Sequence, residues 1–244
     1  MPTSTSVSCP RPVRRSPKVA ASAIAADAPQ IAQVYATPVG GSSSVDLVDG
    51  SRVELNTATR MRTGVTASRR EVWIDQGEAF FEVAHKDGQP FVVHAGDRRV
   101  TVLGTKFSVR RDGADVAVTV LEGRVRVEQL KDGEAIRSTI ITGGEIALAK
   151  GPATMLTTRS AERVERVLSW RSGMLTFDQD NLASIAAEFN RYNDRKLVVT
   201  DASAAATRIG GVFPADDPEA FVELLRDAYG LKVTETGDEI KISD

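Results

Sequence analysis

Apolar and polar residues alternate in short runs between Val45 and Lys150, and turn signals containing glycine separate the runs. The alternation is strictest in Val116–Val120 and Val125–Glu128, where every second residue is valine. A period of two predicts strands with one face toward a core and the other toward water. Because the connections are too short for parallel crossovers, we expect antiparallel pairing. The predicted strands are residues 45–48, 52–55, 71–75, 79–83, 91–94, 99–103, 106–110, 116–121, 124–129, 138–141 and 145–150. Residues 45–158 are therefore predicted to form a mainly β domain, an antiparallel β sandwich or a solenoid-like sheet.

From Trp170 onward the spacing of the apolar residues becomes helical. One helix is expected after a strand at 174–177, with Asp178 or Asp180 as its N-cap. A second helix is expected to begin at Asp217, which precedes a proline at the first helical position, and to end at Gly230. The apolar faces expected for the two helices are Leu182, Ile185, Ala186 and Phe189, and Phe221, Leu224, Leu225 and Ala228.

Further strands are expected at residues 197–199, 210–213, 231–234 and 239–242. Residues 171–244 are thus predicted to form a small α/β module of β-α-β repeats, with both helices packed on one small sheet. A charged helical stretch, residues 159–170, is expected to connect this module to the β domain.

Residues 1–44 are rich in serine, proline and arginine and are predicted to be a disordered leader. The alternatives are a degenerate signal peptide or the remnant of a membrane segment, because the alanine-rich run Val19–Ala26 follows three basic residues. No run approaches the ~18 consecutive apolar residues of a membrane helix. Cys9 is the single cysteine, so it forms no disulfide within the chain.

The sequence contains few of the residue patterns that carry enzymatic chemistry. His85 and His94 are the two histidines, and neither has metal-ligand spacing to another ligand type. A nucleophile elbow and a phosphate-binding loop are both absent from the sequence. Glu78 and Glu82 share one face of a predicted strand, where we expect solvated carboxylates. The sequence therefore predicts no catalytic residue, no metal site, no cofactor and no small-molecule substrate.

Charge distribution favours a protein partner over nucleic acid. The formal net charge is −2. Residues 171–244 contain 8 basic and 14 acidic side chains, a net charge of −6, which suits a basic or polar protein surface. Aromatic residues make up 5% of the chain, too few for a base-stacking surface, and the arginine pairs flank turns.

Several segments together resemble the FecR family, the membrane-bound sigma-factor regulators of bacterial iron uptake. These segments are VDLVDGSRVELN (45–56), GEAFFEVAH (77–85), PFVVHA (90–95), VLGTKFSV (102–109), VTVLEGRV (118–125), WRSGMLTF (170–177), AEFNRYN (187–193), GVF (211–213) and DDP (216–218). The C-terminal repeats resemble the short N-terminal module of secretins and TonB-dependent receptors, a protein-docking unit.

The resemblance implies the periplasmic sensing part of an anti-sigma-factor type regulator. Its implied partner is the signalling domain of a TonB-dependent outer-membrane receptor. A sigma factor is an expected partner only if a further N-terminal segment exists, since residues 1–40 offer neither the sigma-binding segment nor the membrane helix of the family. The alternative function is a β-rich cell-envelope scaffold or a polysaccharide-binding protein.

The best candidate for a docking surface is an unpaired sheet edge in the C-terminal module. Gly210, Gly211, Val212 and Phe213 form a short strand closed by Pro214, which cannot donate to a ladder. These four residues are the predicted partner-binding residues. The opposing interpretation is a central strand whose phenylalanine lies in the core.

Overall fold

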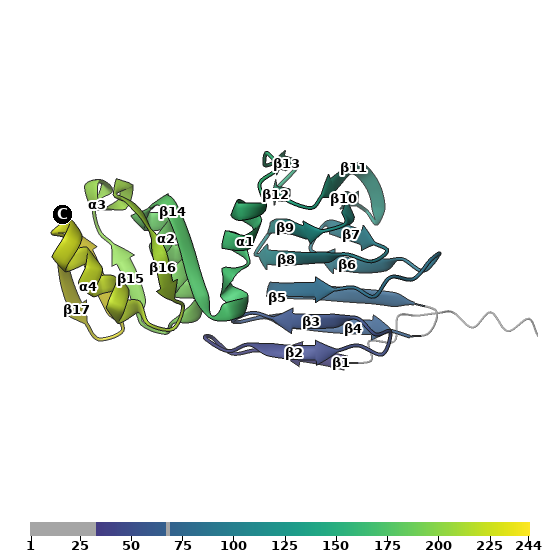
Figure 1. Ribbon diagram of the computed structural model, residues 1–244, viewed down its shortest axis with the longest axis horizontal. Helices are drawn as coiled ribbons and strands as arrows, with labels where there is room; N and C mark the ends of the chain where they lie inside the picture. Colours follow the sequence, from purple (N-terminus) through teal and green to yellow (C-terminus); the bar gives the residue numbers. More distant parts are fainter. Residues whose placement is uncertain (1–32, 67–68) are drawn as a thin grey trace, which may run out of the picture. The chain divides into compact units, whose positions relative to one another are not determined.

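The computed structural model describes residues 33–66 and 69–244 (Figure 1). In these residues a strand-rich part is followed by a smaller part in which helices and strands alternate, which confirms the predicted fold class. One apolar core lies among the strands of the β domain. A second core is formed by the C-terminal elements together with Phe80 and Ile146 of the β domain. Most of the predicted leader, with Cys9, lies outside the described residues.

The β domain is one curled sheet of 13 strands within the described residues. Hydrogen bonds connect its main path in the order β11-β10-β7-β6-β5-β8-β9-β12-β13, while β1–β4 and β2–β3 join β5 from the other side. The strands are β1 Gln33–Ala36, β2 Ser43–Asp46, β3 Arg52–Leu55, β4 Arg60–Val65, β5 Arg70–Glu82, β6 Phe91–Ala95, β7 Arg98–Val102, β8 Lys106–Asp112, β9 Asp115–Glu122, β10 Arg124–Lys131, β11 Glu134–Thr142, β12 Ile146–Lys150 and β13 Ala153–Leu156.

Strand β5 joins the two arms of the sheet, because each of its halves pairs with the strands of a different arm. The first half pairs with β4 and β6, and the second half pairs with β3 and β8. The sequence predicted two strands here, separated near Gly77. Instead the chain continues through Gly77, whose φ of +85° and close approach to Thr59 favour glycine: an added Cβ would lie 2.5 Å from the Thr59 Cα.

One pairing contradicts the expected antiparallel arrangement. Strands β5 and β6 are parallel, with Glu71 opposite Val92 and Ile74 opposite Ala95. The expectation of antiparallel pairing was wrong because we considered only the length of the loop between the two strands. The second half of β5 itself carries the chain into the other arm, so it serves as part of the crossover that parallel strands need.

The β domain also begins earlier than predicted. Strand β1 starts at Gln33 and pairs with β4, and β2 starts at Ser43, so both begin inside the segment that we expected to be leader. The strand β4, with the run Arg60–Val65, was also missed. Strands β1 and β4 were missed because their apolar residues do not alternate over a long enough run. Strand β2 was expected at residues 45–48 and begins two residues earlier, at Ser43.

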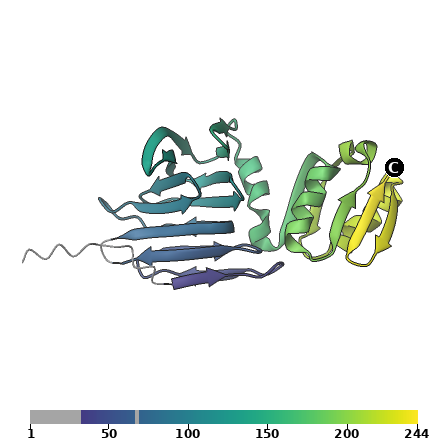
Figure 2. The ribbon, with the colours of Figure 1, turned by 180° about the vertical axis from the view of Figure 1, so that it is seen from behind.

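The C-terminal module has the predicted order of strands and helices, plus one short helix that was not predicted. Its elements are β14 Met174–Asn181, α2 Leu182–Tyr192, β15 Lys196–Val199, α3 Ala202–Ala206, β16 Arg208–Pro214, α4 Pro218–Tyr229, β17 Lys232–Thr236 and β18 Glu239–Ser243. Helix α1 Ala161–Val167 and the 3-10 turn η1 Ser169–Ser172 connect it to the β domain. Both ribbon views show α1 between the strands of the β domain and the module (Figures 1 and 2).

Helix boundaries follow the expected capping chemistry with one exception. Asp217 caps α4 by accepting the Ala220 amide, and Gly230 ends this helix with a left-handed φ of +66°. Helix α2 is capped by Asn181 rather than by Asp178 or Asp180. Its strand β14 continues past Phe177 through a bulge, so the helix starts beyond both aspartates.

The expectation of one small sheet in the module was wrong. Strands β14 and β16 form a two-stranded sheet, and β15, β18 and β17 form a separate three-stranded sheet. Both helices instead meet through aromatic rings: Phe189 of α2 stacks on Phe221 of α4 with ring centroids 4.8 Å apart. Phe213 of β16 meets Phe221 edge-on at 5.1 Å, so one aromatic cluster joins the module.

Candidate protein-docking site

Strand β16 contains the four predicted docking residues and lies at the edge of its sheet. Among the described residues, β14 is the one strand that pairs with it. Phe213 packs into the aromatic cluster, whereas Val212 is 58% exposed. The two opposing interpretations thus each describe part of the strand: its phenylalanine faces the core, and its backbone forms an edge.

The phase of the ladder shows which backbone groups of β16 point away from β14. The Ala215 amide donates to the Gly173 carbonyl at 2.9 Å, so this opposed pair is hydrogen-bonded. Pairs alternate along an antiparallel ladder, so Phe213 and Gly211 also face β14. The Val212 amide and carbonyl therefore point outward, toward the free edge. Pro214, two residues on, has no amide hydrogen to offer.

A buried carboxylate joins the β domain to the module, and sequence analysis missed it. Glu78 is 3% exposed, although we expected a solvated side chain. Its Oε1 accepts hydrogen bonds from Ser108 Oγ at 3.0 Å and from Trp170 Nε1 at 3.1 Å. Its Oε2 accepts from Asn56 Nδ2 and from an Arg191 guanidinium nitrogen, both at 3.0 Å. The four donors come from β8, η1, the segment after β3, and α2.

The charges around this carboxylate extend along helix α2. Arg191 also pairs with Glu188, and Glu188 in turn pairs with Arg110 of β8 at 2.8 Å. Burial alone would raise the pKa of Glu188, but the positive charges of Arg191 and Arg110 outweigh it and lower this pKa. Burial raises the pKa of the Tyr192 phenol well above its ordinary range, and that hydroxyl accepts a hydrogen bond from Asn56. The contact between the two parts is therefore a paired, desolvated polar network.

A signal for Glu78 was present in the sequence. Phe80 and Phe81 are adjacent, and neighbouring strand residues point to opposite faces. Both rings are fully buried, so both faces of β5 are covered at this point. Glu78 shares the face of Phe80, which indicates that something covers the carboxylate as well.

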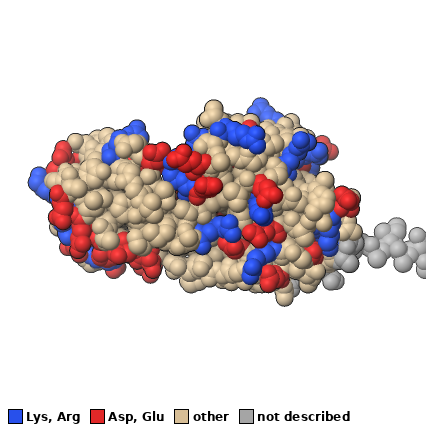
Figure 3. Space-filling model, in the orientation of Figure 1, with Lys and Arg blue, Asp and Glu red and all other residues tan. Residues whose placement is uncertain are grey.

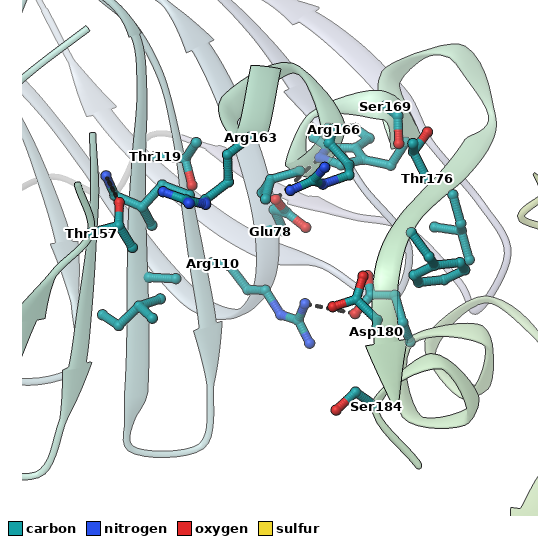
Figure 4. Close-up of a pocket in the computed structure, with 18 residues that line it drawn as sticks. Glu78, Arg110, Thr119, Thr157, Arg163, Arg166, Ser169, Thr176, Asp180 and Ser184 are labelled. Atoms are coloured by element: carbon teal, nitrogen blue, oxygen red, sulfur yellow. Dashed lines mark hydrogen bonds and ion pairs between the residues drawn. The ribbon is translucent and has the colours of Figure 1, made fainter. Parts of the chain in front are cut away.

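A groove of about 440 Å³ opens beside this network (Figure 4). Its floor is the outer face of the β sheet, and its walls are α1 on one side and β14 with the start of α2 on the other. Figure 4 shows Arg163 and Arg166 reaching from the α1 wall, with Asp180 and Ser184 on the opposite wall. The groove is lined by Glu78, Arg110, Ala117, Thr119, Ile146, Leu148, Thr157, Arg163, Arg166, Val167, Ser169, Trp170, Leu175, Thr176, Phe177, Asp180, Ser184 and Glu188.

The two histidines lie apart on the β domain. His85 is exposed and 3.1 Å from Asp87, whereas His94 stacks on Trp73 with ring centroids 5.2 Å apart. Within residues 33–66 and 69–244, no group of three or more His, Cys, Asp and Glu side chains is placed to hold a metal ion. No helix in this part of the chain is long and apolar enough to cross a membrane.

Comparison with known proteins agrees with this architecture. Residues 33–126, from β1 into β10, match the family model described as FecR protein. Two crystal structures of a candidate anti-sigma factor from Parabacteroides distasonis share the fold at 24% sequence identity. They superpose with TM-scores of 0.72 and 0.73, each covering 87% of this chain, and 98% and 99% of their own. No curated protein matches the chain.

The matched segment contains five of the sequence runs on which the resemblance rested, between Val45 and Val125. The solved structures extend the likeness of fold through the C-terminal module, since they cover 87% of the chain. The resemblance to the FecR family is thereby confirmed by the match of residues 33–126 to the family model.

Proposed function

We propose that this protein is a non-enzymatic signal-transduction regulator of the anti-sigma-factor type, acting in the periplasm. Its C-terminal module senses a TonB-dependent outer-membrane receptor by binding that receptor's signalling domain. The FecR match and the fold shared with candidate anti-sigma factors support the regulatory role. Within this proposal, residues 45–158 are the FecR-like domain and residues 171–244 are the docking module, similar to the short module of secretins and TonB-dependent receptors.

The observation that carries the docking proposal is the free edge of β16. A partner strand would pair with the outward amide and carbonyl of Val212, as extended segments do when they add to an exposed sheet edge. Gly210 and Gly211 leave little side-chain bulk beside this edge. The four residues Gly210–Phe213 are therefore the proposed partner-binding segment.

Charge is consistent with a basic or polar partner surface. Figure 3 shows many acidic side chains over the C-terminal module. On α4, Glu223 and Asp227 are exposed and four residues apart, so they lie on one helix face. Such a surface attracts a basic partner over a range of about one Debye length, roughly 8–10 Å.

The proposal assigns sensing, and not sigma-factor binding, to residues 33–244. Binding of a sigma factor is proposed only for a segment N-terminal to the β domain, as the family resemblance implies. Coupling needs no covalent chemistry. It needs only a partner that binds one state of the module better than another.

Calorimetry with the purified signalling domain of a TonB-dependent receptor tests the proposal. Wild-type protein should release or absorb heat on mixing, and Val212→Pro should abolish binding because it removes the outward amide hydrogen. Val212→Thr is the matched control, since it changes the side chain and keeps the amide. Unchanged binding by Val212→Pro would move the docking edge elsewhere.

The same measurement against glycans addresses the alternative, a polysaccharide-binding or scaffold protein. Sugar rings usually stack on an open aromatic face. Here the Trp73 ring lies between His94 and Arg62, whose guanidinium is 5.7 Å from the ring centroid. We expect no heat with glycans, and heat with glycans alone would refute the sensing role.

A further inference from the structure

The groove between α1 and β14 presents a second free strand edge, on the opposite side of the same two-stranded sheet. Strand β14 pairs only with β16 among the described strands. Leu175 is opposite Phe213, and Phe177 is opposite Gly211. Like the pair Gly173–Ala215, both are hydrogen-bonded pairs of the ladder, because such pairs alternate along it. The amide and carbonyl of Thr176 therefore point away from β16, toward the side on which Thr176 lines the groove.

The neighbours of Thr176 on this edge are already bonded. The Met174 carbonyl accepts from the Ser169 hydroxyl at 3.0 Å, and the Asp178 amide donates to the Asp180 carboxylate at 3.0 Å. Thr176 is left as the residue of β14 whose outward backbone groups face the groove between these two capped positions. One residue of an incoming strand can pair with it through two hydrogen bonds.

The shape and lining of the groove suit a short extended segment. Its volume of about 440 Å³ lies within the range of roughly 300–1,000 Å³ found for ligand pockets. Ala117, Ile146 and Leu148 of the sheet provide an apolar floor for alternate side chains of such a segment. Val167 on the α1 wall is 42% exposed and offers a further apolar contact.

The charges of the groove leave one cation uncompensated. Arg110 is paired with Glu188, and Arg166 is paired with Asp178, both at 2.8 Å. Arg163 donates to the Thr158 carbonyl at 2.9 Å, and no carboxylate within the described part of the chain lies in ion-pair contact with it. A carboxylate on the bound segment would form an ion pair with Arg163.

We propose that this groove binds an extended peptide segment of a partner protein, which adds to β14 at Thr176 and places an acidic side chain against Arg163. The site is separate from the β16 edge, so the proposal does not rest on the proposed sensing role. Its occupant is a strand with apolar residues at alternate positions and a carboxylate toward α1.

Trp170 provides the readout, because it lines the groove and the chain has two tryptophans. In full-length Trp73→Phe protein, Trp170 is the one remaining tryptophan. The probe is the synthetic peptide acetyl-Thr-Val-Glu-Val-Thr-Val-amide, titrated to millimolar concentration while Trp170 emission is recorded. The peptide with lysine in place of glutamate is the charge-reversed probe. We expect saturable emission changes with the first peptide, and affinity at least about tenfold lower with the second.

Three variants separate this site from the β16 edge. Thr176→Pro should abolish the emission change, whereas Val212→Pro, the equivalent change on the other edge, should leave it intact. Arg163→Gln should lower the affinity for the glutamate peptide about three- to tenfold. Its affinity for the lysine peptide should be unchanged or higher. If Thr176→Pro does not fold, the Arg163→Gln variant and the charge-reversed peptide still test whether the groove binds the peptide.

Three results would overturn the proposal. The first is no emission change with either peptide, and the second is equal affinity for both. The third is a Trp170 emission that depends on protein concentration, together with a dimer in sedimentation, since the occupant would then be a second copy of this chain.

Discussion

Replacing the buried Glu78 should destabilise the protein far more than replacing a similar exposed carboxylate on the same strand. Glu78→Ala removes the acceptor of four hydrogen bonds, from Asn56, Ser108, Trp170 and Arg191. Breaking a buried ion pair by removing one partner costs about 3–5 kcal/mol. Arg191 keeps its second partner, Glu188, so we do not expect a larger loss. The donors of Trp170 and Ser108 would be left without their acceptor, which places the loss at no less than about 3 kcal/mol.

Glu82→Ala is the matched control, because Glu82 lies four residues along β5 with a 40% exposed side chain. Its ion pair with Arg171, at 3.6 Å, is a surface pair of about 0–1 kcal/mol. Glu78→Gln should fall between the two, since it retains volume and one carbonyl oxygen but turns an NH₂ group toward donors.

Thermal and urea unfolding followed by circular dichroism measure the stability of all three variants. For a unit of this size, a loss of about 3–5 kcal/mol lowers the Tm by roughly 6–20 °C. A Glu78→Ala protein as stable as Glu82→Ala would refute the reasoning, because it would mean that the network contributes nothing beyond its desolvation cost.

Three further predictions concern the module, its charges and β5. Phe189→Ala should cost about 3–5 kcal/mol in urea unfolding because Phe189 is fully buried in the aromatic cluster, and Leu224→Ala should cost less because Leu224 is half-buried. The lowered pKa of Glu188 contributes stability that is fully present above its ordinary pKa of 4.5 and is lost as the pH falls through the lowered pKa. Glu188→Gln should therefore reduce the loss of stability at acid pH. An unaltered loss of stability at acid pH would exclude Glu188 as its source. Gly77→Ala should cost roughly 1–3 kcal/mol more than Gly113→Ala, since both glycines have positive φ but only at Gly77 would a Cβ meet backbone; equal losses would contradict this.

Local patterns were sufficient to predict most strands, both long helices of the module and the order of elements. The proline after Asp217 and the glycine at 230 predicted the start and end of α4 because capping depends on neighbouring residues alone. Val116–Val120 alternates because one face of β9 is buried. These features are written in short segments, so a single sequence is enough to find them.

Features that depend on distant segments could not be predicted in this way. Arg98 is 1% exposed, and its guanidinium donates to the Gly151 carbonyl, 53 residues away. Arg70 is likewise buried against Asp49. From the sequence, an arginine at the start of a strand indicates an exposed end, because its partner is unknown. The groove and the hydrogen-bond partners of Glu78 were missed for the same reason: each set of residues comes from elements of both parts of the chain.

We expect the Glu78 network to determine whether a partner that binds the module also stabilises the β domain. A partner that binds only the folded module stabilises it by about 2.7 kcal/mol at a concentration one hundred times its Kd. If the β domain and the module unfold as one unit, both share that gain. We therefore expect the proposed partner, a receptor signalling domain, to raise the melting temperature of wild-type protein in one transition. Glu78→Ala should separate the two parts, so that calorimetry shows two transitions and the partner raises only that of the module.

The two tryptophans allow each part to be followed. Trp73 lies on β5 in the β domain, whereas Trp170 lies at the junction with the module. Variants that retain one tryptophan each, Trp170→Phe and Trp73→Phe, report the two unfolding events by fluorescence. Trp170→Phe also removes one hydrogen bond to Glu78, so it is compared only with itself in the presence and absence of partner. If the partner shifts Trp73 unfolding equally with and without the Glu78 carboxylate, coupling runs through the apolar contact of Phe80 and Ile146 with the module core instead.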